Sequence, residues 1–300
     1  MRGLRTILPS CLSRLVVGLL CLAWVAPSAA REPGDWRKIA TLDEAGFVSN
    51  DITALGRDMS NTLWVGTARG LVWSRDDGRT WNVADLSDAR SMYGERPFGY
   101  GLNSGPERPS RPGGAALLRR NMITSIAVGR RGVWIGTMNG LCFTYHTDRD
   151  RELWYVFSPE TGGPGPEIYA VGEYRGTVWV SARGGVYRST TWGREWQRVP
   201  GNFPEMIRWI LPTHDRGTEV VLMSGFDAQQ RYGGGADILR GTNEGRDWDA
   251  VRTRTPSRVS TPVVTRAHKL VEIGPTLWAC TRYGLARSGD TGRSWRVIEP

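Results

Sequence analysis

The stretch Leu63–Trp81 reads LWVGTARGLVWSRDDGRTW, and a closely similar stretch, LWACTRYGLARSGDTGRSW, spans Leu277–Trp295. Both contain two apolar runs that alternate with polar residues, a glycine between the runs, and an Asp- and Gly-rich turn before the final tryptophan. Alternation with a period of two predicts half-buried β-strands, and the glycines predict tight turns between them. A pattern that recurs so far apart in one chain indicates a repeat.

Five units of this kind follow one another along the chain. Their first halves are LWVGTARGL from Leu63, VWIGTMNGL from Val133, VWVSARGGV from Val178, the degenerate VVLMSGF from Val220, and LWACTRYGL from Leu277. Their second halves are SRDDGRTW from Ser74, the eroded TYHTDRDRELW from Thr144, STTWGREW from Ser189, GTNEGRDW from Gly241 and SGDTGRSW from Ser288. A further β-rich segment precedes each first half, so each unit predicts four short antiparallel strands, here named A to D.

Four short strands joined by tight turns are the plan of a propeller blade. The sequence therefore predicts an all-β fold, a β-propeller most simply of five blades. The expected blades cover residues 50–90, 121–158, 167–200, 206–253 and 263–300, within a single domain of residues 31–300. Residues 91–120, rich in proline, glycine and arginine, are expected to be a loop insertion.

The Ser-x-Asp-x-Gly-x-x-Trp turns between strands C and D have a structural logic. Asp76 can accept hydrogen bonds from amides of its own turn, Gly78 supplies a positive φ, and Trp81 buries a large side chain against the neighbouring sheet. We expect a structural role and no chemistry for the whole set: Ser74, Asp76, Gly78, Trp81, Ser189, Gly193, Trp196, Gly245, Trp248, Ser288, Asp290, Gly292 and Trp295.

These turns resemble the Asp-box of BNR/sialidase-type propellers, a group that includes sortilin-like luminal domains, xyloglucan-type glycoside hydrolases and photosystem II assembly factors. The Leu-Trp-x-Gly-Thr-x-x-Gly-Leu halves are also similar to the propeller repeat of two-component regulators. The resemblance covers roughly residues 50–300. It implies a propeller fold, and its assembly factors imply a module that holds partners through arginine-rich surfaces.

The first thirty residues predict a secretory signal peptide. Three arginines precede or flank an apolar stretch from Leu15 to Val25, and small residues lead to Ala30. Eleven apolar residues are too few for a membrane span, which needs roughly 20. We therefore expect export to the periplasm or beyond, a mature chain from Arg31, and no transmembrane span in that mature chain.

One segment fits no unit. GDWRKIATL, Gly34–Leu42, has the pattern of an outer fourth strand, although blade five already ends in SWRVIEP. An added strand at the edge of blade five would pair with the free backbone groups there and so prevent that edge from pairing with another chain.

Charge and cysteine content exclude several classes of protein. The formal net charge of +9 falls to about +6 without the three arginines of the signal peptide, and no long basic run is present, so nucleic acid is not an expected partner. Only Cys142 and Cys280 remain in the mature chain, which excludes a disulfide-rich scaffold. We expect both thiols to be free, and we expect no cofactor.

Strands A to D alternate in direction, so the A–B and C–D turns share one end of each blade and the B–C and D–A connections share the other. The long connections all fall at the second end: 93–120, 158–167 and 225–237. Long loops on a rigid scaffold are the usual seat of binding, although an insertion without a partner is the alternative.

The B–C turns themselves carry a set of polar residues. Three of these turns carry an arginine, Arg69, Arg183 or Arg282, and Asn139 lies at the matching place in blade two. Tyr283 follows Arg282, and Arg231 lies in the long loop of blade four. Guanidinium groups from several blades at one channel mouth would suit carboxylates, phosphates or an acidic peptide. The alternative is a set of solvated turn arginines in an arginine-rich chain.

Catalytic signals are weak. His146, His214 and His268 lie far apart without metal-ligand spacing, which argues against a zinc site or a Ser-His-Asp triad. A glycosidase needs two carboxylates across a cleft. The expected loop end offers five carboxylates, Glu95, Glu107, Glu160, Glu167 and Asp227, and three tyrosines, Tyr93, Tyr100 and Tyr232.

The sequence thus favours an exported, non-enzymatic β-propeller that binds or assembles a protein, acidic peptide or acidic glycan partner on its loop end. A glycoside hydrolase or carbohydrate-binding protein is the alternative, and a sensor module is a third. The oligomeric state stays open.

Overall fold

The computed structural model describes residues 49, 51–84, 90–91, 121–145, 154–157, 159, 162–226, 238–251, 267–281 and 284–298. Contacts divide the chain into two units, residues 1–41 and 42–300, and all described residues lie in the second. The predicted signal peptide and the predicted extra strand Gly34–Leu42 lie outside the described residues. No helix in the described part of the chain has the length and apolar character that a membrane span requires.

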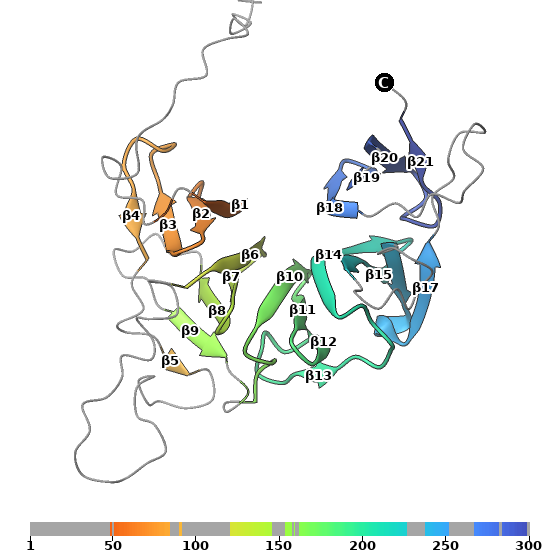
Figure 1. Ribbon diagram of the computed structural model, residues 1–300, viewed down its shortest axis with the longest axis horizontal. Helices are drawn as coiled ribbons and strands as arrows, with labels where there is room; N and C mark the ends of the chain where they lie inside the picture. The colour runs from red at the N-terminus through yellow and green to blue at the C-terminus, as the bar shows by residue number, and fades with distance from the viewer. Residues whose placement is uncertain are drawn as a thin grey trace, which may run out of the picture. The chain divides into compact units, whose positions relative to one another are not determined.

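The described strands form five antiparallel blades, which confirms the predicted five-bladed β-propeller (Figure 1). Blade one holds β1 (Ile52–Arg57), β2 (Leu63–Thr67), β3 (Gly70–Ser74) and β4 (Asn82–Val83). Blade two holds β6 (Ile123–Val128), β7 (Gly132–Thr137), β8 (Gly140–Tyr145) and β9 (Trp154–Phe157). Blade three holds β10 (Ile168–Tyr174), β11 (Thr177–Ala182), β12 (Gly185–Ser189) and β13 (Gln197–Arg198). Blade four holds β14 (Met206–Asp215), β15 (Thr218–Phe226), β16 (Ile238–Thr242) and β17 (Asp247–Val251), and blade five holds β18 (Ala267–Ile273), β19 (Thr276–Thr281), β20 (Gly284–Ser288) and β21 (Arg296–Val297).

Blade two carries one strand more than the repeat predicts. The short strand β5 (Arg90–Ser91) pairs in parallel with β9, opposite Tyr155 and Val156, and so extends the outer edge of this sheet to five strands. The sequence predicts Arg90 at the end of blade one and Ser91 at the start of the loop insertion. Their backbone instead links blade one to the outside of blade two.

The five blades share one register. Each A strand meets its B strand with an irregularity near its start, directly after Ile52, Ile123, Ile168, Ile207 and Ala267. These five residues therefore hold equivalent positions. Such a bulge bends the strand and sharpens its twist, which helps an inner strand to follow the propeller axis.

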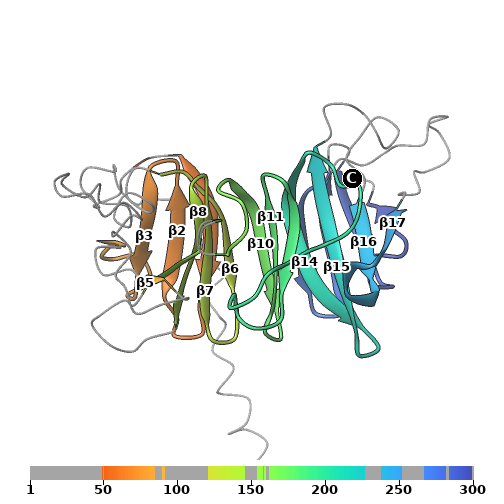
Figure 2. The ribbon, with the colours of Figure 1, turned by 90° about the horizontal axis from the view of Figure 1, so that it is seen from below.

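The core lies between successive sheets. Trp64, Trp134 and Trp179, each the second residue of the predicted B-strand motif, are buried there. The A strands of adjacent blades also pack together, β1 with β6, β6 with β10, β10 with β14 and β14 with β18. Figure 2 shows the inner strands of blades two, three and four side by side. Both sheet faces of a middle blade are therefore buried, whereas the turns project at the two ends of its strands.

Candidate functional site: the B–C turns and their opposite end

A threonine side chain stabilises the backbone of the B–C turn of blade one. The hydroxyl of Thr67 donates to the carbonyl of Gly70 at 2.9 Å and accepts from the amide of Arg69 at 3.1 Å. The amide of Ala68 donates to the carbonyl of Asp51 at the start of strand A. These bonds fix the turn backbone and leave the Arg69 side chain exposed.

Blade two repeats the arrangement. Thr137 donates to the carbonyl of Gly140 at 2.8 Å and accepts from the amide of Asn139 at 3.1 Å, and Asn139 is exposed. In blade five Thr281 donates to the carbonyl of Gly284 at 2.7 Å. In blades one and two, a threonine two residues before Arg69 and Asn139 is therefore the local reason why the turn backbone that carries each residue is fixed.

Blade three replaces the threonine with Ala182 and uses an ion pair. The guanidinium of Arg183 donates to Glu167 Oε1 at 2.8 Å, and the amide of Arg183 donates to the carbonyl of Glu167 at 2.8 Å. The other carboxylate oxygen, Oε2, accepts from the hydroxyl of Tyr169 at 2.9 Å. Glu167 thus joins a D–A connection, a B–C turn and an A strand at one point.

This cluster changes the chemistry of its tyrosine. Desolvation first, and then the hydrogen bond to the Glu167 carboxylate, raise the pKa of Tyr169 above its ordinary value. The phenol therefore stays protonated at neutral pH and serves as a hydrogen-bond donor. Arg183 keeps most of its side-chain surface in solvent, so an incoming carboxylate can compete with Glu167 for the guanidinium.

Three of the six predicted ligand-binding residues are described: Arg69, Asn139 and Arg183. Each lies exposed in the B–C turn of its blade, as the repeat predicts, and no hydrogen bond or ion pair joins their side chains within the described residues. Arg231, Arg282 and Tyr283 lie outside the described residues. The proposed arginine cluster therefore stays a prediction.

The C–D turns at the opposite end satisfy their polar groups internally. In blade one, Asp76 accepts from the amide of Thr80 at 2.8 Å and from its hydroxyl at 2.6 Å, while Ser74 donates to Asp76 at 2.8 Å. The amide of Gly78, at a φ of 84°, donates to Ser74 Oγ at 2.8 Å. The hydrogen bonds from Thr80, followed by the one from Ser74, lower the pKa of Asp76 to about 2.

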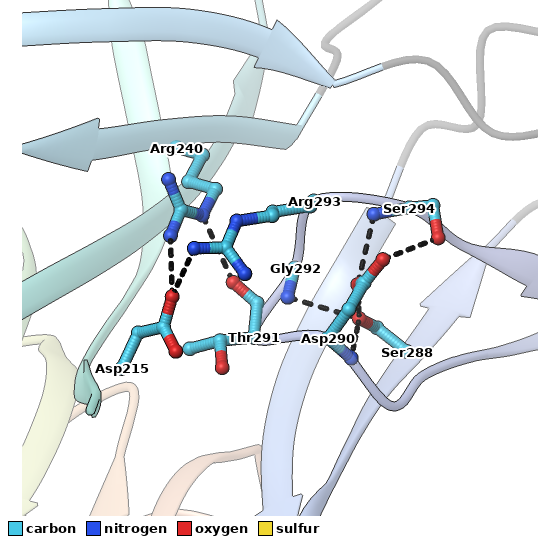
Figure 3. Close-up of polar contacts among 8 residues, drawn as sticks. All are labelled: Asp215, Arg240, Ser288, Asp290, Thr291, Gly292, Arg293 and Ser294. Carbon is cyan, nitrogen blue, oxygen red and sulfur yellow. Dashed lines mark hydrogen bonds and ion pairs between the residues drawn. The ribbon is translucent and has the colours of Figure 1, made fainter.

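Blade five builds the same turn (Figure 3). Ser288 donates to Asp290 at 2.7 Å, and Asp290 accepts from the amide and hydroxyl of Ser294 at 2.9 and 2.6 Å. Partial burial acts to raise the pKa of Asp290, but the hydrogen bonds from Ser294 and Ser288 outweigh it and lower the pKa. The carboxylates of Asp76 and Asp290 thus accept hydrogen bonds from within their own turns.

The C–D turns of blades three and four lack the aspartate of the Ser-x-Asp-x-Gly-x-x-Trp pattern and are held by other hydrogen bonds. In blade three Thr191 replaces the aspartate and accepts from the amide of Glu195 at 2.8 Å, and the amide of Gly193 donates to Ser189 at 2.9 Å. In blade four the short 3-10 turn η2 (Asn243–Gly245) places the indole of Trp248 so that it donates to the carbonyl of Gly245 at 2.7 Å. Trp196 and Trp248 pack edge-on against Trp134 and Trp179 of the preceding blades.

A polar network between blades three and four was not apparent from the sequence. Glu219 accepts from the indole of Trp179 at 2.8 Å and from Arg188 at 2.8 Å. Arg188 also lies 3.7 Å from Glu244 in the C–D turn of blade four. An arginine directly before a C–D turn is the only sequence signal, and it does not name a partner in the next blade.

The catalytic candidates do not converge in the described part of the chain. His214 Nδ1 lies 2.6 Å from the hydroxyl of Tyr174 and the rings stack, whereas His268 is exposed on β18. Among the carboxylates named from the sequence, only Glu167 is described, and Arg183 and Tyr169 engage it. Within the described residues, no three His, Cys, Asp or Glu side chains could hold a metal ion.

The two described cysteines are unpaired. Cys142 on β8 is buried, and burial raises the pKa of its thiol to about 12. Cys280 on β19 is exposed. The two thiols therefore differ sharply in their access to reagents.

Comparison with solved structures supports the fold alone. The chain matches the extracellular domain of BT4673 from B. thetaiotaomicron with 16% identity and a TM-score of 0.52, over 83% of this chain and 28% of that one. It matches an ancestral GH74 enzyme with 14% identity and a TM-score of 0.51, over 84% and 33% of the two chains. YCF48 from Cyanidioschyzon merolae matches with 12% identity and a TM-score of 0.45, over 82% and 70%.

The chain spans about a third or less of the length of the first two solved structures. No protein-family model and no curated protein matches the sequence. The BT4673 domain and the GH74 enzyme, with TM-scores above 0.5, are propellers, so they confirm the predicted fold. One is an extracellular domain and another an enzyme, so the fold does not decide between binding and catalysis.

Proposed function

We propose that this protein is a non-enzymatic β-propeller that binds an acidic partner, a protein segment or peptide, on its B–C turns. The observation that carries the proposal is the exposure of Arg69 and Arg183 on turns whose backbones are fixed by hydrogen bonds. A guanidinium offers a planar fork of donors to a carboxylate, and a fixed turn backbone lowers the cost of ordering the segment that carries it.

The repeat extends this surface to further residues. Asn139 would donate its amide to the same partner, and Arg282, Tyr283 and Arg231 would complete the set from blades five and four. Their sequence positions match those of Arg69 and Arg183, or fall in the adjoining loop. Arg183 would exchange its bond to Glu167 for a partner carboxylate, which leaves Tyr169 as a hydrogen-bond donor beside it.

The proposal includes export. Residues 1–30 have the charge, length and small terminal residues of a cleaved signal peptide. The partner would then be met in the periplasm or outside the cell. Intact mass of the protein from the envelope fraction tests this, since cleavage gives a chain that begins at Arg31, whereas a soluble species that retains residues 1–30 contradicts it.

A glycoside hydrolase is the competing function, because carboxylates are present in the loop segments and the fold is shared with a GH74 enzyme. The geometry favours binding, since the one described candidate carboxylate, Glu167, already accepts from two side chains. Reducing ends released from a panel of β-glucans would favour the enzyme.

Fluorescence anisotropy with a labelled hexaglutamate peptide tests the proposed function. We expect binding that weakens as salt rises, because exposed charges are screened beyond about 8 Å at ~0.15 M salt. A hexaglutamine peptide is the neutral control, and an oligogalacturonate tests the acidic glycan alternative. Equal binding of hexaglutamate and hexaglutamine would contradict recognition of negative charge.

A further inference from the structure

The A–B turns and the C–D turns lie at the same end of the blades, opposite the B–C turns, and they carry a repeated set of arginines (Figure 2). In the described C–D turns an exposed arginine directly follows the glycine that has a positive φ: Arg79, Arg194, Arg246 and Arg293. The amide of each arginine donates to the carbonyl oxygen of the residue three positions earlier. The turn backbone of each of these blades is therefore held by a hydrogen bond, and its arginine side chain is exposed.

Three A–B turns add further exposed arginines at this end. Arg130 and Arg131 lie between β6 and β7, Arg175 lies between β10 and β11, and Arg216 lies between β14 and β15. The arginines of both kinds of turn thus come from all five blades, since Arg79 belongs to blade one and Arg293 to blade five.

Arg175 and Arg216 have backbone conformations that the local preference does not give to arginine. Each is the first residue of a two-residue turn, with φ values of 50° and 90° for Arg175 and Gly176, and of 48° and 86° for Arg216 and Gly217. Such a turn favours Asn, Asp or Gly at its first position, because other side chains are crowded at a positive φ. The chain accepts this strain twice to place an arginine at the tip of a hairpin, which indicates a role beyond the turn itself.

Several carboxylates at this end form hydrogen bonds or ion pairs within the fold. Asp76 and Asp290 accept from their own turns, and Glu173 accepts from two backbone amides at 2.7 and 3.0 Å. Glu244 lies 3.7 Å from an arginine of the preceding blade, whereas Glu195 stays exposed. The carboxylates of Asp76, Asp290 and Glu173 are therefore bonded to amides and hydroxyls rather than to the neighbouring arginines.

Two arginines at this end have an anionic partner, and others do not. Arg57 pairs with Asp77, and Arg293 pairs with Asp215 (Figure 3). Within the described residues, no hydrogen bond or ion pair engages the guanidinium groups of four others: Arg79, Arg194, Arg216 and Arg246. Like charges at one end repel one another, so a partner that supplies negative charge across this end is attracted to it.

Apolar side chains lie at the same end in blades one and five. Met59, in the A–B turn of blade one, is 74% exposed, and Ile273, beside the A–B turn of blade five, is 62% exposed. Tyr145, at the end of β8 where the C–D turn begins, is exposed as well. Basic side chains combined with exposed apolar ones bind anionic bilayers, because the cations meet lipid phosphates while the apolar groups enter the headgroup region.

We propose that the A–B and C–D turns form a docking surface for a bilayer that contains anionic phospholipids. The turn arginines contact the lipid phosphates, and Met59 and Ile273 enter the headgroup region. A flat, extended surface meets arginines of several blades at once, whereas a short peptide reaches those of one or two blades. The bound protein would hold its B–C turns away from the bilayer, at the end where the peptide partner is proposed to bind.

Sedimentation with vesicles of equal parts phosphatidylglycerol and phosphatidylcholine tests this surface. We expect the wild type to bind these vesicles, to bind pure phosphatidylcholine at least about 10-fold more weakly, and to dissociate as salt rises. Arg175→Asn/Arg216→Asn should lower the partition coefficient about 30-fold, since each basic side chain near the lipid contributes about a factor of five. Asparagine suits the positive φ of both positions, so the melting temperature of this variant should not fall.

Arg69→Asn/Arg183→Asn is the matched control, because it removes the same number of exposed turn arginines from the opposite end. It should bind the vesicles as the wild type does, and Arg175→Asn/Arg216→Asn should still bind labelled hexaglutamate, so this proposal and the proposed function fail separately. Equal losses of vesicle binding in the two double variants, or no loss in Arg175→Asn/Arg216→Asn, would overturn the docking surface. Binding of soluble polyphosphate as tight as that of the vesicles would show that the turns bind phosphates in solution, and would overturn it as well.

Discussion

The two ends of the blades use charged side chains in opposite ways. At the C–D end, Asp76 accepts from its own turn, and Glu219 is shared by Trp179 and Arg188. At the B–C end, Arg69 projects into solvent from a turn that the backbone and Thr67 already hold. Charged groups that form hydrogen bonds within the fold stabilise it, whereas charged groups without such bonds are available to a partner. The comparison therefore predicts that substitutions of the hydrogen-bonded groups at the C–D end lower stability and that substitutions at the B–C end weaken peptide binding.

The largest effect is expected where a C–D turn meets the next blade. Gly245→Ala should lower the free energy of unfolding by about 3 kcal/mol, because alanine is strained at a φ of 81° and its Cβ would lie 2.6 Å from Trp179. Gly217→Ala is the matched control, with a φ of 86° and open space around the added Cβ, and should cost about 1–2 kcal/mol. Urea unfolding measures both. Equal losses would mean that the contact between blades contributes nothing beyond backbone strain.

Two glutamate–arginine pairs provide the next test. Glu219→Ala should cost about 2–3 kcal/mol, because Arg188, with only 11% of its side chain exposed, would lose a charged hydrogen bond. Glu167→Ala at the B–C end should cost less than about 1 kcal/mol, since the Arg183 side chain is 71% exposed. Thermal or urea unfolding of the two variants compares the ends directly. A larger loss of stability in Glu167→Ala than in Glu219→Ala would contradict the assignment of stability to the C–D end.

How far the sequence predicted these features depends on the range of the interaction. Strand positions and turns follow from local rules, such as alternation along Leu63–Trp81 and the glycine at a positive φ, so the five blades were predictable. The short strand β5 was not, because two residues carry no periodicity and their partner, β9, lies in the next blade.

At the candidate site, too, local positions were predictable from the sequence and contacts between distant segments were not. The exposed B–C positions of Arg69 and Arg183 follow from the repeat. Glu167 was named as a loop carboxylate, but its bonds to Arg183 and Tyr169 depend on how a D–A connection crosses a B–C turn. Sequence spacing does not determine that crossing.

A smaller effect is expected with pH. The pKa of Asp76 is about 2 in the folded protein, below the ordinary value of 3.8, so its ionised form stabilises the fold. That stabilisation is complete above about pH 4 and is lost as the pH falls through about 2. The melting temperature of the wild type should therefore fall more steeply over this range than that of Asp76→Asn. Parallel curves for the two proteins would show that the turn does not depend on the charge.

The central claim is that arginines at the B–C end, rather than positive charge in general, capture the partner. The direct measurement is the affinity for labelled hexaglutamate of the double variant Arg69→Ala/Arg183→Ala, against Arg194→Ala/Arg246→Ala, which removes two exposed arginines from C–D turns. We predict a loss of at least about 10-fold for the first and less than about twofold for the second, with both variants folded. Equal losses in the two double variants, or no loss in the first, would contradict the account.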